Sequence, residues 1–162
     1  MYKNLLPIKK TRFLVTGGSG SFGRNIIKRL LDLGAEKIIS ISRDEALIKE
    51  AEIEINSRFV KFKLGDIADK EFVPNVMKDI DVVFHTAALK HVSLAEQNPR
   101  EAHRINILGL LNVLNSSPLI QRLIYVSSDK AINVTNCYGA TKLLAEYLVR
   151  ESNELYKKSK YV

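Results

Sequence analysis

The chain alternates between short apolar runs and longer segments in which apolar residues recur every three or four positions. Short apolar runs predict buried strands, and the longer spacing predicts helices with an apolar face. The predicted strands cover residues 12–18, 37–42, 59–66, 81–87 and 122–128. The predicted helices cover residues 22–34, 44–56, 69–78, 98–116 and 138–157. Strands that alternate with helices predict an α/β fold in which helices cover both faces of a parallel sheet.

The last five residues, KSKYV (158–162), look like the start of a sixth strand. A doubly wound parallel sheet of the Rossmann type, which binds dinucleotides, normally has six strands. We therefore expect residues 1–162 to form one Rossmann-type domain that is truncated near the start of its sixth strand. A C-terminal substrate-binding portion would then be absent.

The composition, with 46% hydrophobic and 27% charged residues, is typical of a soluble globular protein. No run of about 18 apolar residues occurs, so we expect no membrane span. The first residues, MYKNLLPIKK, lack the apolar core of a signal peptide. The single cysteine, Cys137, cannot form an internal disulfide, so we expect a reducing, cytoplasmic location.

The net charge of +7 raises the hypothesis of a nucleic-acid partner. The excess of positive charge lies at the two ends of the chain, however, and the charges of the remainder balance. The basic residues at the ends are Lys3, Lys9, Lys10, Arg12, Lys157, Lys158 and Lys160. Two solvated basic ends explain the charge without a binding groove, so we predict no nucleic-acid partner.

A glycine-rich segment, TGGSGSFG (16–23), joins the first predicted strand to the first predicted helix, with Gly17, Gly20 and Gly23 three positions apart. Glycines allow a tight turn and a close approach of the backbone to a pyrophosphate, and the N-terminus of the following helix favours an anion. The strand, loop and helix together predict a dinucleotide site. A glycine-rich turn that binds nothing is the alternative.

The second predicted strand ends in SRDE (42–45). At this point an acidic residue usually binds the ribose 2′-hydroxyl of NAD, whereas an arginine accommodates the 2′-phosphate of NADP. The chain has both residue types, Arg43 and Asp44. Because Arg43 comes first, at the tip of the strand, we predict NADP as the cofactor and keep NAD as the alternative. The alternative for Arg43 is an exposed arginine in a loop that binds no ligand.

Tyr138 and Lys142 stand four positions apart at the start of the last predicted helix, so they share one face of it. A nearby ammonium stabilises a phenolate, which lets a tyrosine take a proton from a sugar hydroxyl while hydride leaves the same carbon. The pair by itself is also typical of an ordinary contact on a helix surface.

Further segments follow in a fixed order: GDIAD (65–69), HTAALKHV (85–92), AEQNP (95–99), INILGLLNVL (105–114), SSDKAIN (127–133) and YGATK (138–142). With the glycine-rich segment and SRDE, they resemble the extended short-chain dehydrogenase/reductases. More narrowly, the series is similar to the C5-inverting UDP-N-acetylglucosamine 4,6-dehydratases of the polysaccharide-biosynthesis group. The resemblance covers the chain from about Arg12 to Leu148 and implies a UDP-sugar substrate.

The resemblance also implies a catalytic role for five residues. Tyr138 and Lys142 match the pair that oxidises C4 of the hexose. Ser128 stands where a threonine that helps to bind the 4-hydroxyl is usual. Asp129 resembles the acid that protonates the departing C6 hydroxyl, and Lys130 resembles the base that takes the C5 proton. A charged turn between a strand and a helix would carry the same Asp-Lys pair.

The cofactor-binding residues predicted from the loop, from SRDE and from the resemblance are Gly17, Gly20, Ser21, Phe22, Gly23, Ser42, Arg43, Asp44, Asp66, Ile67, Ala87, Ala88, Lys90, Asn106, Tyr138 and Lys142. Strand ends and amides on core helices also serve packing and capping, so a structural role is the alternative for Asp66, Ile67, Ala87, Ala88, Lys90 and Asn106. The histidines, His85, His91 and His103, lack the spacing of metal ligands, and we predict no metal.

Two apolar helices, 98–116 and 138–157, correspond to helices that pack against a second subunit in the resembled family. We therefore predict a homo-oligomer, although a buried core helix would show the same apolarity. Three functions stay open. Asp129-Lys130 favours an inverting 4,6-dehydratase, because retaining dehydratases carry Asp-Glu there and 4-epimerases lack the acid–base pair. A 4-epimerase, or a truncated NADP-binding module without turnover, is the alternative.

Overall fold

The computed structural model describes residues 7–116, 120–155 and 160–162. Its six-stranded sheet is parallel and has the strand order β3-β2-β1-β4-β5-β6. The strands are β1 (Arg12–Thr16), β2 (Lys37–Ser42), β3 (Val60–Leu64), β4 (Val82–His85), β5 (Arg122–Tyr125) and β6 (Lys160–Tyr161). This is the Rossmann order, so the predicted fold class is confirmed, and β6 is a strand of two residues.

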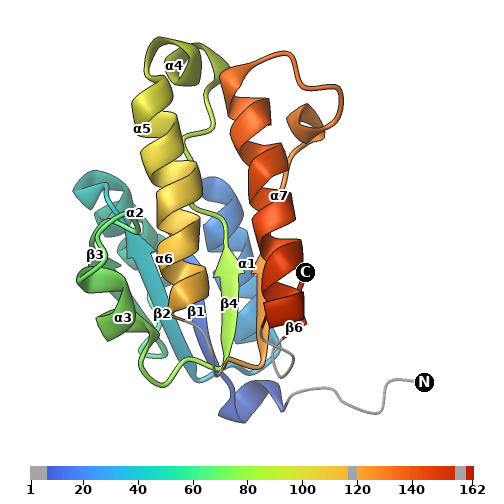
Figure 1. Cartoon of the computed structure of the whole chain (residues 1–162). Coiled ribbons are helices and arrows are strands. Elements are labelled where there is room, and N and C mark those ends of the chain that lie inside the picture. The colour runs from blue at the N-terminus through green and yellow to red at the C-terminus, as the bar shows by residue number, and fades with distance from the viewer. Residues whose placement is uncertain (1–6, 117–119, 156–159) are drawn as a thin grey trace.

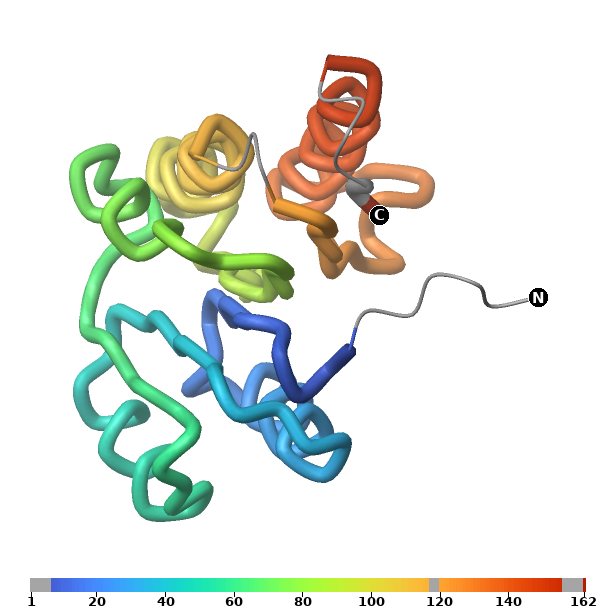
Figure 2. Tube along the Cα trace, turned by 90° about the horizontal axis from the view of Figure 1, so that it is seen from below, coloured from blue at the N-terminus to red at the C-terminus, as the bar shows by residue number. Residues whose placement is uncertain are grey.

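Helices cover both faces of the sheet, as Figure 1 and Figure 2 show. The helices α1 (Ser21–Asp32) and α2 (Glu45–Ile55) lie on one face. The opposite face carries α3 (Phe72–Met77), α5 (Pro99–His103), α6 (Gly109–Asn115) and α7 (Cys137–Leu155). The sequence pattern did not predict the short helix α4 (Val92–Gln97) or the 3₁₀ turns η1 (Ile8–Lys10) and η3 (Asp129–Ala131).

Successive side chains of a strand point to opposite faces of the sheet, so alternate residues pack in two separate hydrophobic clusters. Phe13 and Val15 pack under α1 with Ile27. Leu14 points the other way and packs in the larger cluster beneath α3, α6 and α7. Burial on both faces explains why the central strands β1 and β4 read as continuous apolar runs rather than as alternating ones.

The helix predicted over residues 98–116 is not one regular α-helix. A π-helical turn, η2 (Arg104–Leu108), separates α5 from α6. Such turns occur frequently at functional sites, and this one contains the buried Asn106. At Gly109 an added Cβ would lie 2.7 Å from the side chain of Ile67, so a larger residue there would force Ile67 to move.

The last predicted helix, 138–157, begins one residue earlier, at Cys137, and is described as far as Leu155. The predicted helix residues 156–157 lie outside the described residues. Three of the basic residues at the chain ends, Lys3, Lys157 and Lys158, lie outside them as well. Within the described ranges, no helix has the length and apolarity that a membrane crossing requires. In that same part of the chain, His, Cys, Asp and Glu side chains form no group of three that could hold a metal ion.

Candidate active site

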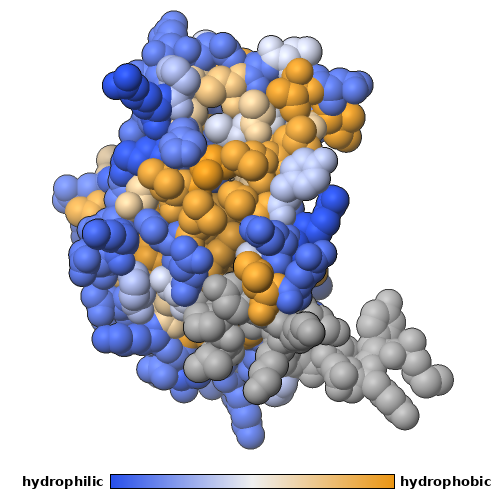
Figure 3. Space-filling view, in the orientation of Figure 1, coloured by the Kyte–Doolittle hydropathy of each residue, from blue (hydrophilic) through white to orange (hydrophobic). Residues whose placement is uncertain are grey.

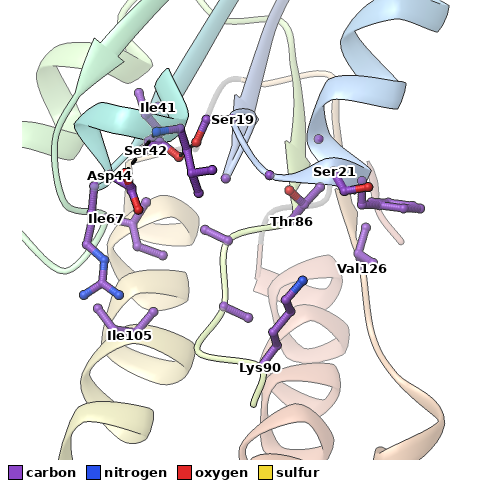
Figure 4. Close-up of a pocket in the computed structure, with 18 of the residues that line it drawn as sticks. Ser19, Ser21, Ile41, Ser42, Asp44, Ile67, Thr86, Lys90, Ile105 and Val126 are labelled. Atoms are coloured by element: carbon purple, nitrogen blue, oxygen red, sulfur yellow. Dashed lines mark hydrogen bonds between the residues drawn. The ribbon is translucent and has the colours of Figure 1, made fainter. Parts of the chain in front are cut away.

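A cavity of about 860 Å³ lies at the carboxyl ends of the central strands (Figure 4). This is the crevice in which open α/β sheets bind ligands, beside the point where the strand order reverses between β1 and β4. The predicted residues that line it are Gly17, Gly20, Ser21, Phe22, Gly23, Ser42, Arg43, Asp44, Ile67, Ala87, Ala88, Lys90, Tyr138 and Lys142. The fold therefore brings the predicted phosphate loop and the predicted Tyr-Lys pair to one space.

The glycine-rich loop is packed so tightly that glycine is required at two positions. Gly17 has a φ of +69°, in the left-handed region that other residues rarely adopt. An added Cβ on Gly23 would lie 2.5 Å from the carbonyl oxygen of Gly17, so the loop fits directly against the first turn of α1. That helix begins without a side-chain cap, and its first residues, Ser21 and Phe22, line the cavity. Its free N–H groups suit an anion such as a pyrophosphate.

The tip of β2 places Arg43 and Asp44 on the cavity wall, but each already has a partner. Asp44 caps α2, because its carboxylate accepts a hydrogen bond of 3.0 Å from the backbone N–H of Leu47. The Nη1 of Arg43 donates to Glu101, at 3.0 Å. Asp44 thus uses Oδ1 as a helix cap, and Arg43 is the residue of this pair that carries hydrogen-bond donors for a ligand.

Two of the predicted cofactor-binding residues, Asp66 and Asn106, do not line the cavity. Asp66 accepts hydrogen bonds from Ala68 and from Arg104. The buried amide of Asn106 accepts from the N–H of Leu89 at 2.8 Å and donates to the carbonyl oxygen of the same residue at 3.1 Å. It therefore fixes the loop after β4, which carries Ala87, Ala88 and Lys90 into the cavity wall.

Lys142 is buried at the back of the cavity, one helical turn from Tyr138. Its Nζ donates to the carbonyl oxygen of Val126 at 2.5 Å and lies 4.1 Å from the centroid of the Tyr125 ring. Burial lowers the pKa of Lys142 to about 8, and the charge of Glu146 partly opposes this shift. The ammonium therefore sits close to its titration range at neutral pH, which suits a group that exchanges protons with a neighbour.

His85, at the end of β4, is buried beside this pair, and its ring stacks on Tyr125 at a centroid distance of 5.9 Å. Its Nδ1 lies 3.1 Å from Oγ1 of Thr16. Burial, assisted by the charge of Lys142, lowers the pKa of His85 to about 3. The imidazole is therefore neutral at physiological pH and adds no positive charge next to Lys142.

The predicted Ser128, Asp129 and Lys130 lie on an exposed turn rather than in the cavity wall. Nζ of Lys130 lies 2.5 Å from Oδ2 of Asp129, and the two side chains are 48% and 77% exposed. The hydrogen bond from Lys130 lowers the pKa of Asp129, and the hydrogen bond from Ser128 lowers it by a smaller amount. At Gly139 an added Cβ would lie 2.2 Å from the carbonyl oxygen of Lys130, so the turn packs against α7 directly beside Tyr138.

Further residues line the cavity that the sequence reasoning missed: Ser19, Ile41, Glu45, Ala46, Leu47, Gly65, Thr86, Ile105, Val126 and Ser127. Most of them are neighbours of predicted residues at the same strand ends, and this adjacency was the signal available. Ser127 carries an additional contact that the sequence does not show, because its hydroxyl donates to Glu146 on α7.

A family model described as polysaccharide biosynthesis protein matches residues 13–162. The inverting UDP-N-acetylglucosamine 4,6-dehydratase of Campylobacter jejuni serotype O:2 is 41% identical over 149 residues, which cover 90% of this chain and 45% of that protein. A UDP-glucose 4-epimerase of Rickettsia bellii is 40% identical over 141 residues, which cover 83% of this chain and 41% of that protein.

Among solved structures, the UDP-glucose 4-epimerase of Bifidobacterium longum in complex with NAD⁺ and UDP has a TM-score of 0.84 and 25% sequence identity. The match covers 93% of this chain and 51% of that one. The chain thus spans about half the length of the relatives that it matches.

Proposed function

The chain belongs to the polysaccharide biosynthesis protein family and is an extended short-chain dehydrogenase/reductase, and from this premise we propose that the whole protein is a nucleotide-sugar 4,6-dehydratase. The proposed reaction inverts C5 of UDP-N-acetylglucosamine. The observation that carries the proposal is the Asp129–Lys130 ion pair on a turn that packs against α7 beside Tyr138. The Campylobacter relative supports the same assignment.

We infer that the cavity holds NADP, and its residues fit that group. The glycine loop and the start of α1 would bind the pyrophosphate, and Arg43 would meet the 2′-phosphate. When bound, the nicotinamide supplies the acceptor for a hydride and its later donor. The Bifidobacterium epimerase, which holds NAD⁺ in the same fold, supports a nicotinamide dinucleotide and leaves NAD as the alternative.

In the proposed mechanism, Tyr138 takes the proton of the sugar 4-hydroxyl while hydride leaves C4. The buried Lys142 supports this step, because its ammonium stabilises the phenolate that takes the proton. His85 is neutral, so it offers the phenolate no second positive charge in competition with Lys142. The hydroxyl of Ser128, which here donates to Asp129 and accepts from the N–H of Lys130, would turn its donor to the same sugar hydroxyl.

The acid and the base that expel water would come from the Asp129–Lys130 pair. As an exposed ion pair it has the wrong protonation for this task, because Lys130 lowers the pKa of Asp129 and thereby keeps the carboxyl ionised. We infer that a bound sugar removes water from the pair and so favours transfer of one proton from Lys130 to Asp129. The neutral Lys130 then takes the C5 proton, and Asp129 gives its proton to the C6 hydroxyl, which leaves as water. These two transfers restore the ion pair.

The test is incubation of the whole protein with NADP and UDP-N-acetylglucosamine, followed by mass spectrometry and NMR of the product. A product that is lighter by one water and inverted at C5 is expected, and Tyr138→Phe should lower its rate by about 10²–10⁴-fold. Lys130→Met should block water loss and still permit oxidation at C4. A 4-epimerase is the second candidate, because the Rickettsia epimerase is almost as similar. A C4 epimer of unchanged mass would establish it and refute the dehydratase.

We also infer that a second copy of the chain packs on α6 and α7. Apolar side chains gather on this face of the molecule (Figure 3). The large exposed ones on the two helices and the turn before α6 are Leu108, Leu144, Tyr147 and Leu155. Light scattering should show a dimer or larger assembly, and Leu144→Glu should shift it to monomer. A monomer at all concentrations of the unchanged chain would refute the inference.

A further inference from the structure

Four charged side chains from three parts of the chain form one network at the side of the cavity. Arg43 follows β2, Asp66 follows β3, and Glu101 and Arg104 belong to α5 and the π turn. Oε1 of Glu101 accepts from Nη1 of Arg43 at 3.0 Å and from Nη2 of Arg104 at 2.9 Å. Nε of Arg104 donates to Oε2 of Glu101 at 2.8 Å, and its Nη2 also donates to Asp66 at 2.8 Å.

Only Arg43 of this network lines the cavity. Among the described residues, its protein partners are reached through Nη1 alone: the bond to Glu101 and a longer contact of 3.9 Å with Asp66. The other guanidinium nitrogens of Arg43 therefore keep their N–H groups for a ligand. A guanidinium offers its donors in a planar fork, so an acceptor that holds one arm also sets the direction of the other.

The charges of the network balance, because two guanidinium groups face two carboxylates. Glu101 is shared between Arg43 and Arg104, so it holds Arg43 without being its exclusive counter-ion. The two arginines, Arg104 first, lower the pKa of Glu101 to about 2, which keeps the carboxylate ionised at any physiological pH. The fourth member, Asp66, bonds Arg104 and is further from Arg43.

We propose that Glu101 is a positioning residue for cofactor selectivity, which holds the guanidinium of Arg43 where the 2′-phosphate of NADP would bind. The inference rests on the proposed function, because it requires a nicotinamide dinucleotide in the cavity. A free arginine side chain loses rotamer freedom when it binds a phosphate, and an arginine that is already held loses less. Because NAD has no 2′-phosphate, its affinity does not depend on this arrangement.

The test is the dissociation constant of each cofactor, measured by calorimetry on the purified chain and its variants, with circular dichroism as the check of folding. Glu101→Ala should weaken NADP binding about fivefold and change NAD binding by less than about twofold, from the cost of immobilising one long side chain. Glu101→Gln keeps an acceptor oxygen and should restore most of the NADP affinity. Glu151→Ala is the matched control, because it removes an exposed helical carboxylate that does not line the cavity; it should not weaken NADP binding.

Two results would overturn the inference alone. One is tighter NADP binding by Glu101→Ala, which would make Glu101 a competitor of the phosphate for Arg43. The other is an equal change, or no change, for both cofactors in a variant that folds. If the unchanged chain binds neither cofactor, the proposed cofactor site fails, and this inference fails with it.

Discussion

Replacement of the buried Lys142 by methionine should stabilise the fold while it removes the ammonium that we propose to assist Tyr138. Lys142 is 3% exposed, and its burial lowers its pKa from 10.5 to about 8. Since one pKa unit corresponds to about 1.4 kcal/mol, keeping this ammonium buried at pH 7 lowers the free energy of unfolding by about 3 kcal/mol. A methionine of similar length fills the same space without that cost, and its sulfur also packs on the Tyr125 ring.

Part of this gain is offset. The carbonyl oxygen of Val126, which accepts from Lys142, loses that hydrogen bond, at a cost of about 1 kcal/mol. We therefore expect Lys142→Met to raise the free energy of unfolding by about 2 kcal/mol at pH 7, the difference between these two terms.

The stability difference between the variant and the unchanged chain should depend on pH. Between pH 8 and pH 10.5 the unfolded lysine keeps its proton and the folded one releases it, so the unfolded state binds more protons and the stability of the unchanged chain rises with pH. The advantage of the variant should therefore shrink to near zero by about pH 10. Urea unfolding followed by circular dichroism at several pH values measures this. Lys78→Met, at an exposed position, is the control and should change stability by less than about 0.5 kcal/mol. A less stable Lys142→Met at pH 7, or an advantage independent of pH, would refute the reasoning.

Three further predictions concern buried positions around the cavity. Gly23→Ala places a methyl group 2.5 Å from a loop carbonyl oxygen, so calorimetry should show NADP binding weakened at least about tenfold; unchanged affinity would contradict the tight packing. His85, with its pKa lowered to about 3, lets the unfolded state bind more protons between pH 3 and pH 6.5. Stability should therefore fall with decreasing pH across that window, and His85→Leu should flatten this slope in urea unfolding at pH 4 to 6.5. Asn106→Leu leaves both backbone groups of Leu89 without their partner and should cost about 2–4 kcal/mol by the same assay, whereas a cost below about 1 kcal/mol would show that water replaces the amide.

Local patterns were sufficient to predict the regular elements of the fold. The strands β1 and β2 and the helix α1 begin and end within about two residues of the predicted positions, because the apolar periodicity and the positive φ at Gly34 both act over a few residues. The helix α4 and the turn η3 were missed, since six and three residues are too few to show a period. The π turn was also missed, because its apolar residues repeat as those of an α-helix do.

The Tyr-Lys pair and the glycine loop were each visible in the sequence, but only the family resemblance, and not their spacing, placed them at one cofactor site. Thr16 and His85 lie side by side only because β4 pairs with β1 rather than with its predecessor β3. That pairing brings the ends of β1, β4 and β5 together and leaves both Tyr138 and Gly17 on the walls of one space. Sequence spacing carries no record of strand order, which depends on how the whole sheet buries its two faces.

The sequence by itself determined the elements, the turn chemistry and the kinds of residue at the strand ends, because these follow from backbone geometry and from neighbours a few positions away. Only the tertiary structure decided their electrostatic state. The pKa of Lys142 depends on burial beneath the sheet end, and the partner of Arg43 is Glu101, which is 58 positions away in the chain. Desolvation and ion pairing depend on distance in space, so they are fixed only when the packed sheet brings these groups together.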